Sequence, residues 1–405
     1  MRILFTTTRG AGHFNPLVPF AQACVRAGHE LLVAGPSGAE PQARRAGLPF
    51  SPLPEPPAQE LEAAWSPVFS LPLEEQDEYV VREVFAGCHA RAALPATLEL
   101  SESWEAELVV RESAEFSGAI AAERLGVPHA TVGVSLAAAT DRLYIGAAAP
   151  VVDELRTGLR LEPDPDAERL LAAPLLTRAP ASLDDPGSPA AALRFHEARE
   201  PPAALPDWWR GSDAPLVYMS FGTEVPTMPF YPGLYQAALA ALAQQPLRLL
   251  VTIGHKADPS ELGELPGNAH VERWVPQAAV MPHAAAMIGH GGSGSTLTAL
   301  AWGVPMVLLP LFADQPANAR RVDETGAGVL LDGGPPALAG LASAVRDLLD
   351  DPGYAAAARA IGDEMAALPH VDEAAGVLAS VAASDGGARR RARSAERHAQ
   401  RSERG

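Results

Sequence analysis

Hydrophobic and polar residues in the first half of the chain follow two alternating patterns. Short aliphatic or β-branched runs, which predict strands, lie at 2–7, 29–34, 106–110 and 127–134. Between them, stretches such as 16–27 and 114–125 place apolar residues at helical spacing and predict helices. Strands that alternate with helices are typical of βαβ units and a mostly parallel sheet. The segment 52–75, rich in proline and glutamate, interrupts the pattern, and we expect a surface excursion there that shapes a pocket.

A second series of the same kind occupies the other half of the chain. The expected strands are 215–220, 247–253, 269–273, 286–290 and 304–309, with helices that begin near Tyr231, Gln277, Ser295 and Gln315. Because 405 residues are too many for one ordinary core, we predict two domains, 1–197 and 214–384, joined by the proline-rich linker 198–213. Both are expected to be Rossmann-like, doubly wound α/β domains that face each other across a cleft. We allow for the last helices of the second domain to pack back on the first.

Composition and charge narrow the function classes. The net charge is −18, and the low-complexity tail 385–405 carries seven arginines against three acidic residues, which leaves −22 on the rest of the chain. A body this acidic repels nucleic acid, and we expect the tail to be disordered. No apolar run approaches the ~18 residues of a membrane span, and no secretory leader is recognisable, which favours a cytoplasmic protein. Cys24 and Cys88 lack partners at metal-binding spacing and are expected to be buried and unpaired.

The loop after the first strand, Thr6–Pro16, reads TTTRGAGHFNP. It is a poor dinucleotide-binding loop, because Asn15 stands where the third glycine of a G-x-G-x-x-G fingerprint would stand. The second strand also ends without the acidic residue that would hold a ribose hydroxyl, so hydride transfer is disfavoured. The loop offers His13 instead, a titratable side chain at the carboxyl end of a strand, where open α/β sheets bind their ligands.

The most informative stretch, 270–319, predicts a nucleotide site. A strand ends at His290, and the loop that follows consists of Gly291, Gly292, Ser293 and Gly294, before a helix that begins near Ser295. Small side chains let a phosphate approach the backbone, where free N–H groups and the helix dipole attract its charge. Side-chain donors are expected from His290, Ser295, Thr296, Ser220 and Thr223. The loop has no Walker lysine.

Two further segments complete this nucleotide site. Trp274 directly follows the strand 269–273 and precedes Val275, so its indole can stack on a flat base while nearby backbone groups pair with it. Asp314 and Gln315 open another helix at a strand's carboxyl end and can bind sugar hydroxyls.

These residues resemble the donor-binding signature of family 1 glycosyltransferases of the GT-B fold, most of all the bacterial enzymes that glycosylate polyketides and other natural products. The resemblance implies that Trp274 to Gln277 hold the base, that His290 to Thr296 hold the pyrophosphate, and that Asp314 and Gln315 hold the sugar. It further implies that His13 is the general base. An acid that orients this base falls on Glu112, where the family usually has Asp, and Glu115 is a weaker substitute.

The resemblance implies an inverting O-glycosyltransferase that joins a nucleotide sugar to a small-molecule aglycone, as a monomer or homodimer, without a cofactor or metal. Family members that use ribonucleotide donors commonly have Glu where this chain has Thr298, so the expected donor is a dTDP-activated deoxyhexose. The alternatives are a UDP-sugar-dependent enzyme, a non-catalytic sugar-nucleotide-binding partner, and a sugar-nucleotide 2-epimerase. An epimerase would need carboxylates around the sugar, and the sequence indicates none beyond Asp314.

The remaining candidates are expected to be structural. Asp164 and Asp166 match a D-x-D metal motif but lie among prolines away from a strand end, so we discount them. Several histidines have no chemical constellation around them, namely His89, His129, His196, His255, His283 and His370.

Overall fold

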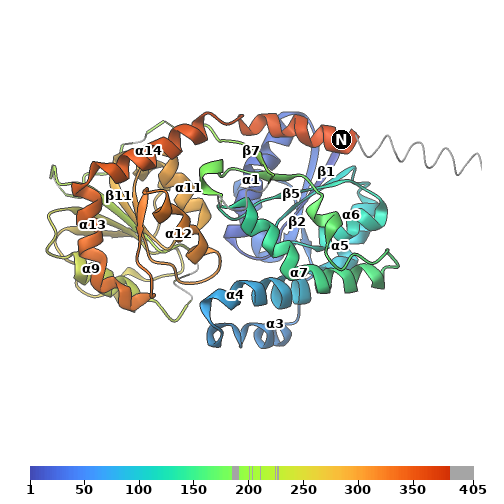
Figure 1. Cartoon of the computed structure of the whole chain (residues 1–405), viewed down its shortest axis with the longest axis horizontal. Coiled ribbons are helices and arrows are strands. Elements are labelled where there is room, and N and C mark those ends of the chain that lie inside the picture. Colours follow the sequence, from blue (N-terminus) through green and yellow to red (C-terminus); the bar gives the residue numbers. More distant parts are fainter. Residues whose placement is uncertain are drawn as a thin grey trace, which may run out of the picture.

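The computed structural model describes residues 1–184, 191–199, 201–202, 204–209, 211–223, 225 and 228–383, which form two α/β units side by side (Figure 1). The first sheet consists of β1 (Arg2–Thr6), β2 (Glu30–Pro36), β3 (Phe50–Leu53), β4 (Leu108–Glu112), β5 (His129–Val132), β6 (Leu175–Thr177) and β7 (Leu193–Arg194). Its order is β3-β2-β1-β4-β5-β6-β7, and every pairing is parallel. The order reverses between β1 and β4, which is the switch point where open α/β sheets bind ligands.

The second sheet repeats this plan. It consists of β8 (Leu216–Ser220), β9 (Arg248–Thr252), β10 (Ala269–Glu272), β11 (Ala284–Gly289), β12 (Met306–Leu308) and β13 (Gly328–Leu330). The order is β10-β9-β8-β11-β12-β13, again all parallel, with the switch point between β8 and β11. Two Rossmann-like domains therefore face each other, as the alternating sequence pattern predicts.

Helices cover both sheets. In the first unit they are α1 (Ala11–Arg26), α2 (Glu40–Arg45), α3 (Ala58–Trp65), α4 (Leu73–Tyr79), the π-helix η3 (Val80–Ala90), α5 (Arg91–Ser103), α6 (Ser117–Leu125), α7 (Ala138–Gly158) and α8 (Glu168–Leu171). In the second unit they are α9 (Gly233–Leu242), α10 (Gln277–Val280), α11 (Ser293–Ala301), α12 (Gln315–Glu324), α13 (Leu341–Asp350) and α14 (Pro352–Ala366). Helices on both faces bury the strands, which explains their continuous apolar runs; Ile3, Leu4 and Phe5 of β1 are all fully buried.

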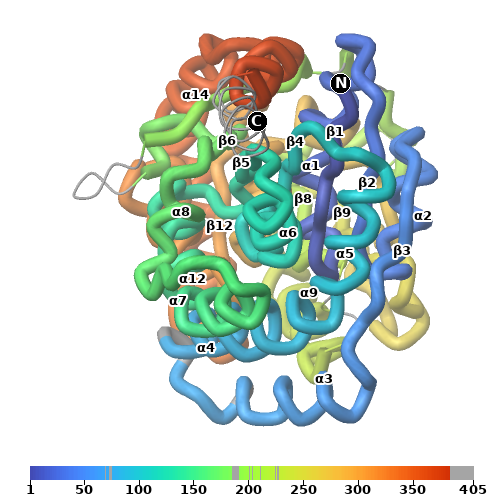
Figure 2. The backbone as a smooth tube through the Cα atoms, turned by 90° about the vertical axis from the view of Figure 1, so that its right-hand side faces the viewer, coloured from blue at the N-terminus to red at the C-terminus, as the bar shows by residue number. Residues whose placement is uncertain are grey.

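The chain ends its described course back on the first unit. After α14, Val371, Ala374 and Leu378 pack into the same core as Phe20 and Phe195, and Figure 2 shows this last, red part of the described chain at the same end of the molecule as the N-terminus. The two segments that join the units also meet. His196 and His370 lie on these two segments and form a parallel bridge. The linker predicted at 198–213 is described only in part, and the tail 385–405 lies outside the described residues.

The predicted excursion at 52–75 contains α3, the start of α4 and the end of β3, and in Figure 1 both helices lie at the lower edge of the first unit. Helix α1 begins at Ala11, not near Pro16, because the N–H groups of His13 and Phe14 donate to the Gly10 carbonyl and form a turn before the proline.

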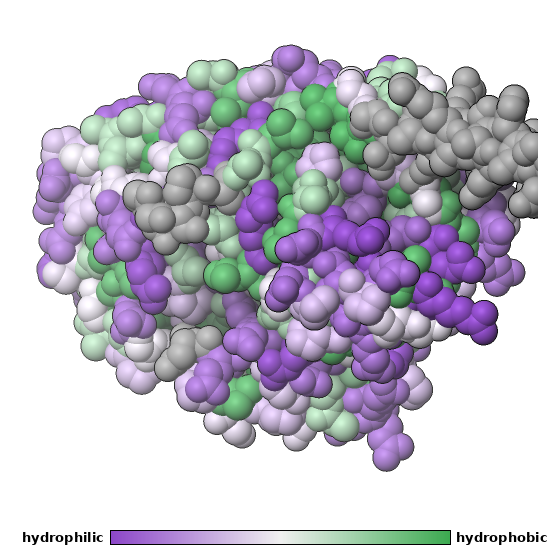
Figure 3. Space-filling view, turned by 45° about the vertical axis from the view of Figure 1, so that its right-hand side comes forward, coloured by the Kyte–Doolittle hydropathy of each residue, from purple (hydrophilic) through white to green (hydrophobic). Residues whose placement is uncertain are grey.

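The surface of the protein mixes hydrophilic and hydrophobic residues. On the face in Figure 3, the hydrophilic residues dominate, and the hydrophobic ones lie among them. Within the described part of the chain, none of the helices is both long and apolar enough to span a bilayer.

Candidate active site

His13 lies in the first turn of α1, directly after the carboxyl end of β1. Gly10 precedes the helix with a φ of 116°, so the chain turns sharply from the strand into α1. The imidazole of His13 packs edge-on against the ring of Phe85 of η3, with ring centroids 4.9 Å apart. Its side chain is 19% exposed, so one side remains accessible while the rest is enclosed.

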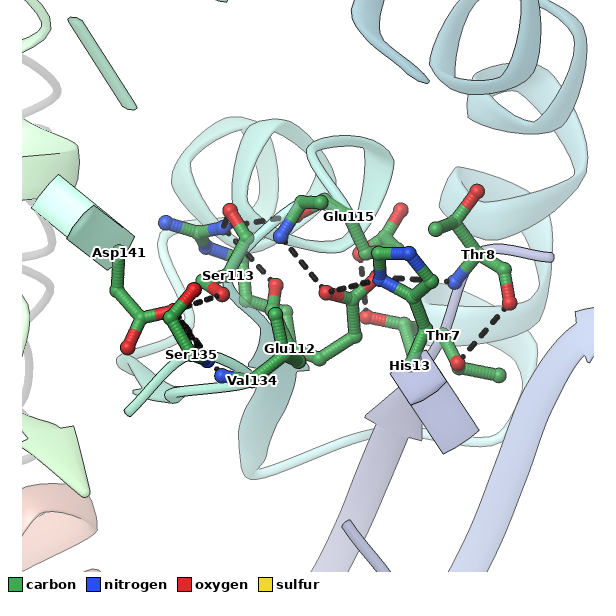
Figure 4. Close-up of polar contacts among 12 residues, drawn as sticks. Thr7, Thr8, His13, Glu112, Ser113, Glu115, Val134, Ser135 and Asp141 are labelled. Carbon is green, nitrogen blue, oxygen red and sulfur yellow. Dashed lines mark hydrogen bonds and ion pairs between the residues drawn. The ribbon is translucent and has the colours of Figure 1, made fainter. Parts of the chain in front are cut away.

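Glu112 ends β4, the strand beside β1, and its fully buried carboxylate faces His13 (Figure 4). Glu112 Oε2 lies 3.2 Å from His13 Nδ1. The same carboxylate accepts hydrogen bonds from the backbone N–H groups of Thr8, at 3.2 Å, and Ala114, at 2.7 Å. A glutamate is one methylene longer than aspartate, and here its length still allows direct contact with the histidine.

The loop that carries Glu112 is held by a buried arginine. Arg111 Nη1 donates to the carbonyl oxygens of Glu112, Ser113 and Glu115, at 2.9 to 3.1 Å. Glu115 bonds to Thr6 and to the start of α6 instead of to His13. Of the two glutamates that the sequence offers as partners for the base, Glu112 is therefore the one in contact with it.

Burial and charge act on His13 in opposite directions. Burial by itself would lower the pKa of the imidazole, but the negative charge and hydrogen bond of Glu112, helped by Asp314 and Asp141, outweigh it. The pKa of His13 is therefore raised above its ordinary value of 6.5.

Three aspartates extend this acidic environment across the two units. Asp141 of α7 accepts hydrogen bonds from the Ser113 hydroxyl at 2.6 Å and from the backbone of Val134 and Ser135 (Figure 4). Burial raises the pKa of both Asp141 and Asp77 to about 7, and the charge of Asp314 contributes to each shift. Asp314 thus has carboxyl neighbours from the first unit, which the sequence pattern did not indicate.

The glycine-rich loop lies at the switch point of the second sheet. Gly291 has a φ of 88°, and a Cβ there would lie 2.9 Å from the backbone oxygen of Gln315, so this position requires glycine. The sequence pattern placed Ser293 and Gly294 in the loop, with the helix beginning near Ser295. In the structure α11 begins at Ser293, so both residues belong to its first turn. Among the described residues, no side chain caps this nine-residue helix, and its first N–H groups remain available to an anion.

His290 lies between two glycines. A Cβ at Gly222 or Gly292 would approach the imidazole to 2.8 or 2.5 Å, so both positions need the space that glycine leaves. Burial lowers the pKa of His290 to about 4, so the ring is neutral at pH 7 and can donate from one nitrogen. Ser220, at the end of the neighbouring strand, is buried beside this loop, and Thr223 is exposed.

The start of α12 is tied to the glycine-rich loop. Asp314 Oδ2 accepts hydrogen bonds from Ser293 Oγ at 3.0 Å and from Asn318 Nδ2 at 2.8 Å. Gln315 is buried, and its Oε1 accepts from the backbone N–H groups of Leu311 and Phe312. This carbonyl therefore shapes the loop before α12, while Asp314 lies beside α11.

Asn318 is a further residue that sequence reasoning missed. Its amide also donates to the Gly291 carbonyl at 2.9 Å, and its Oδ1 accepts from the N–H of Leu136 in the first unit at 3.4 Å. The only available signal was its spacing, because it lies four residues after Asp314 on the same helix face.

The segment predicted to hold the base, Trp274 to Gln277, contacts the first turn of α11. Trp274 is 54% exposed, and Val275 packs against the core of the second unit. Gln277 Nε2 donates to Ser295 Oγ at 3.1 Å, which ties this segment to the first turn of α11. In that helix Thr296 is buried, and the Thr298 hydroxyl donates to the Gly294 carbonyl at 2.8 Å.

Asp164, the first residue of the discounted D-x-D motif, stabilises the start of a helix. Asp164 accepts hydrogen bonds from the backbone of Glu168 and Arg169 at the start of α8, and it lies 3.9 Å from Arg156. Across the described ranges, the structure has no group of three or more His, Cys, Asp or Glu residues that could hold a metal.

The sequence of the chain is similar to those of known proteins. A family model described as Erythromycin biosynthesis protein CIII-like, C-terminal domain, matches residues 236–381. The chain is 32% identical over 376 residues to L-demethylnoviosyl transferase of Streptomyces niveus, covering 91% of this chain and 95% of that protein.

Solved structures of glycosyltransferases are also similar to this chain. The glycosyltransferase SsfS6 of Streptomyces sp. SF2575, complexed with thymidine diphosphate, is 29% identical with a TM-score of 0.72, over 94% of this chain and 99% of that one. Glycosyltransferase VinC in complex with dTDP is 25% identical with a TM-score of 0.73, over the same shares. The chain therefore belongs to family 1 of the glycosyltransferases, as an enzyme of the GT-B fold in the group that joins sugars from nucleotide donors to natural products.

Proposed function

We propose that this glycosyltransferase moves a deoxyhexose from a dTDP-linked donor to a hydroxyl group of a natural-product aglycone, with inversion at the anomeric carbon. The observation that carries the proposal is the contact of 3.2 Å between His13 and Glu112 at the switch point of the first sheet. Helix α1, which has this histidine in its first turn, contacts α11, which follows the glycine-rich loop. A base and an anion site on facing helices suit a transfer between two bound substrates.

His13 acts as the general base on the acceptor. Its Nδ1–H donates to the Glu112 carboxylate, so the lone pair of Nε2 receives the proton of the acceptor hydroxyl. As this proton leaves, the acceptor oxygen forms a bond to the anomeric carbon, and the bond from that carbon to the diphosphate oxygen breaks. Attack from the side opposite the leaving group inverts the configuration.

The second unit stabilises the leaving diphosphate. The free N–H groups at the start of α11, together with the helix dipole, face the negative charge that develops on it. The neutral His290 ring adds a donor, and Asp314 and Gln315 hold sugar hydroxyls. Positive charge from a metal is not needed in this scheme.

The donor preference rests on Thr298. A ribonucleotide offers two ribose hydroxyls to a carboxylate at this position, whereas a 2′-deoxyribose offers one. A carboxylate left partly unsatisfied would cost about 1 to 3 kcal/mol. The Thr298 hydroxyl is already bonded within α11 and leaves no such deficit. The two related structures solved with thymidine diphosphate support the same preference.

The Thr298→Glu variant tests this donor assignment by calorimetry. We expect the parent to bind dTDP more tightly than UDP, and the variant to shift the ratio of the two dissociation constants toward UDP by about tenfold. The 2′-deoxy analogue dUDP isolates the 2′-hydroxyl from the methyl group of thymine, and Thr298→Gln matches the length of Glu without its charge. Equal or tighter binding of UDP by the parent would overturn the donor assignment, although not the enzyme class.

The pH dependence of transfer tests the base. His13 must be neutral to accept a proton, and its pKa is raised above 6.5, so kcat/KM should rise with pH through a range above 6.5 and then level off. In the Glu112→Gln variant, burial lowers the pKa of His13 without the opposing charge of Glu112. The rise of kcat/KM with pH should therefore occur at lower pH than in the parent. Initial rates between pH 5 and 9 measure both limbs, and an identical limb in parent and variant would contradict the assignment.

A 2-epimerase is no longer disfavoured by a lack of carboxylates, because Asp77 and Asp141 lie within electrostatic reach of Asp314. The relatives reported above are glycosyltransferases, however, and they support the transfer reaction over epimerisation.

A further inference from the structure

Trp274 is one of the few large hydrophobic side chains on the surface, with 54% of it exposed. One part of its ring is covered by the imidazole of His255, which is itself exposed. The two rings are stacked, with centroids 5.9 Å apart and planes inclined by 23°. This is the range of favourable offset stacking between aromatic rings.

The backbone brings the two side chains together. Strands β9 and β10 pair in parallel up to Thr252 and Glu272, and the pairing continues beyond both strands. Ile253 N–H donates to the Glu272 carbonyl at 3.2 Å, and Gly254 N–H donates to the Arg273 carbonyl at 2.8 Å. The chain then turns at Gly254, whose φ is 85°. The positions of His255 and Trp274 are therefore set by sheet hydrogen bonds at the carboxyl end of the second sheet.

We propose that His255 is a positioning residue of the donor site, whose imidazole holds the Trp274 ring as a fixed platform on which the pyrimidine base of the nucleoside diphosphate stacks. This inference rests on the proposed function and on the predicted role of Trp274 in holding the base. Because His255 covers one face of the indole, the base takes the other face. An exposed indole without this support would lose rotamer freedom when the base binds, and holding it in advance removes that cost.

A double-mutant cycle tests this role through dissociation constants for dTDP measured by calorimetry. We expect His255→Ala to weaken binding about three- to tenfold, and Trp274→Ala to weaken it at least as much. His255→Phe keeps a flat ring in place and should bind within about twofold of the parent. In the Trp274→Ala background, His255→Ala should have no further effect, because the histidine acts only through the indole.

His270→Ala is the matched control. His270 stacks on Trp208 at 4.8 Å and 19° in the same unit, but it lies at the start of β10 and Trp274 lies beyond its end. Its loss should change thermal unfolding without changing the affinity for dTDP.

The outcomes distinguish a wrong role for His255 from a wrong base site at Trp274. Unchanged binding by His255→Ala, with weakened binding by Trp274→Ala, would overturn the role of His255 and leave the base site intact. A double variant weakened by the product of both single effects would also overturn it, because His255 would then contact the nucleotide independently. Unchanged binding by Trp274→Ala would remove the proposed base site itself.

Discussion

Replacing His13 by alanine is expected to lower the transfer rate by about 10² to 10⁴, the contribution of a well-placed general base. The affinity for dTDP should stay within about twofold of the parent, because binding at α11 needs no contact with the histidine. The physical reason is that the acceptor hydroxyl has a very high pKa and attacks poorly unless its proton is taken as the new bond forms. Donor binding involves a separate set of groups, namely the N–H groups of α11, His290 and Asp314.

Release of dTDP in the presence and absence of aglycone measures the rate, and calorimetry measures the affinity. His29→Ala, at the half-buried residue just before β2, is the control for loss of an imidazole without loss of the base. Turnover of His13→Ala within tenfold of the parent would remove the histidine from the mechanism, provided that both proteins show the same thermal unfolding.

Removal of the Glu112 charge should have the second largest effect. A hydrogen bond to a charged group contributes about 1.5 to 3 kcal/mol, so Glu112→Gln should slow transfer about tenfold to a hundredfold. Glutamine retains the length of the side chain, and its one oxygen can still accept from Ala114 if the amide NH2 takes the place of Oε1, where the bond from Thr8 is then lost. It cannot stabilise the imidazolium that forms when His13 takes the proton.

Glu115→Gln provides a matched comparison. Glu115 is buried on the same loop, but its carboxylate bonds to Thr6, Ser117 and Gly118 and not to His13. This substitution should reduce the free energy of unfolding and change the transfer rate by less than about threefold, since these buried contacts at the start of α6 act mainly on stability. A greater loss of rate for Glu115→Gln than for Glu112→Gln would reverse the assignment of the two glutamates.

Much of the fold could be predicted from local patterns. The buried strands β1, β8 and β11 read as apolar runs because helices cover both faces of a parallel sheet. Helix starts were less accurate: α1 begins five residues before Pro16, and α11 begins at Ser293. At such boundaries, the spacing of apolar residues carries little information, because the first turn is held by backbone geometry and not by its side chains.

The candidate site was predictable where its chemistry is local. Gly291 and Gly292 stand next to His290 in the sequence, and their small size is itself the signal for a close backbone approach. The contribution of Asn318 was not predictable in this way, because it contacts Gly291 and Leu136 from distant parts of the chain. The stack of His255 on Trp274 likewise depends on how two strand ends pair.

The sequence by itself determined the alternation of strands and helices, the glycine-rich turn into α11, and the residue types offered at the strand ends. These properties follow from periodicity and backbone freedom, which act over a few residues. Only the tertiary structure decided that Glu112 and not Glu115 faces His13, 99 residues away in the chain. It also decided that the charge of Asp314 acts on the buried carboxyl groups of Asp77 and Asp141 and helps to raise their pKa values. Such pairings depend on the packing of whole elements, since a carboxylate's partner and pKa are set by the neighbours that burial brings within a few ångströms.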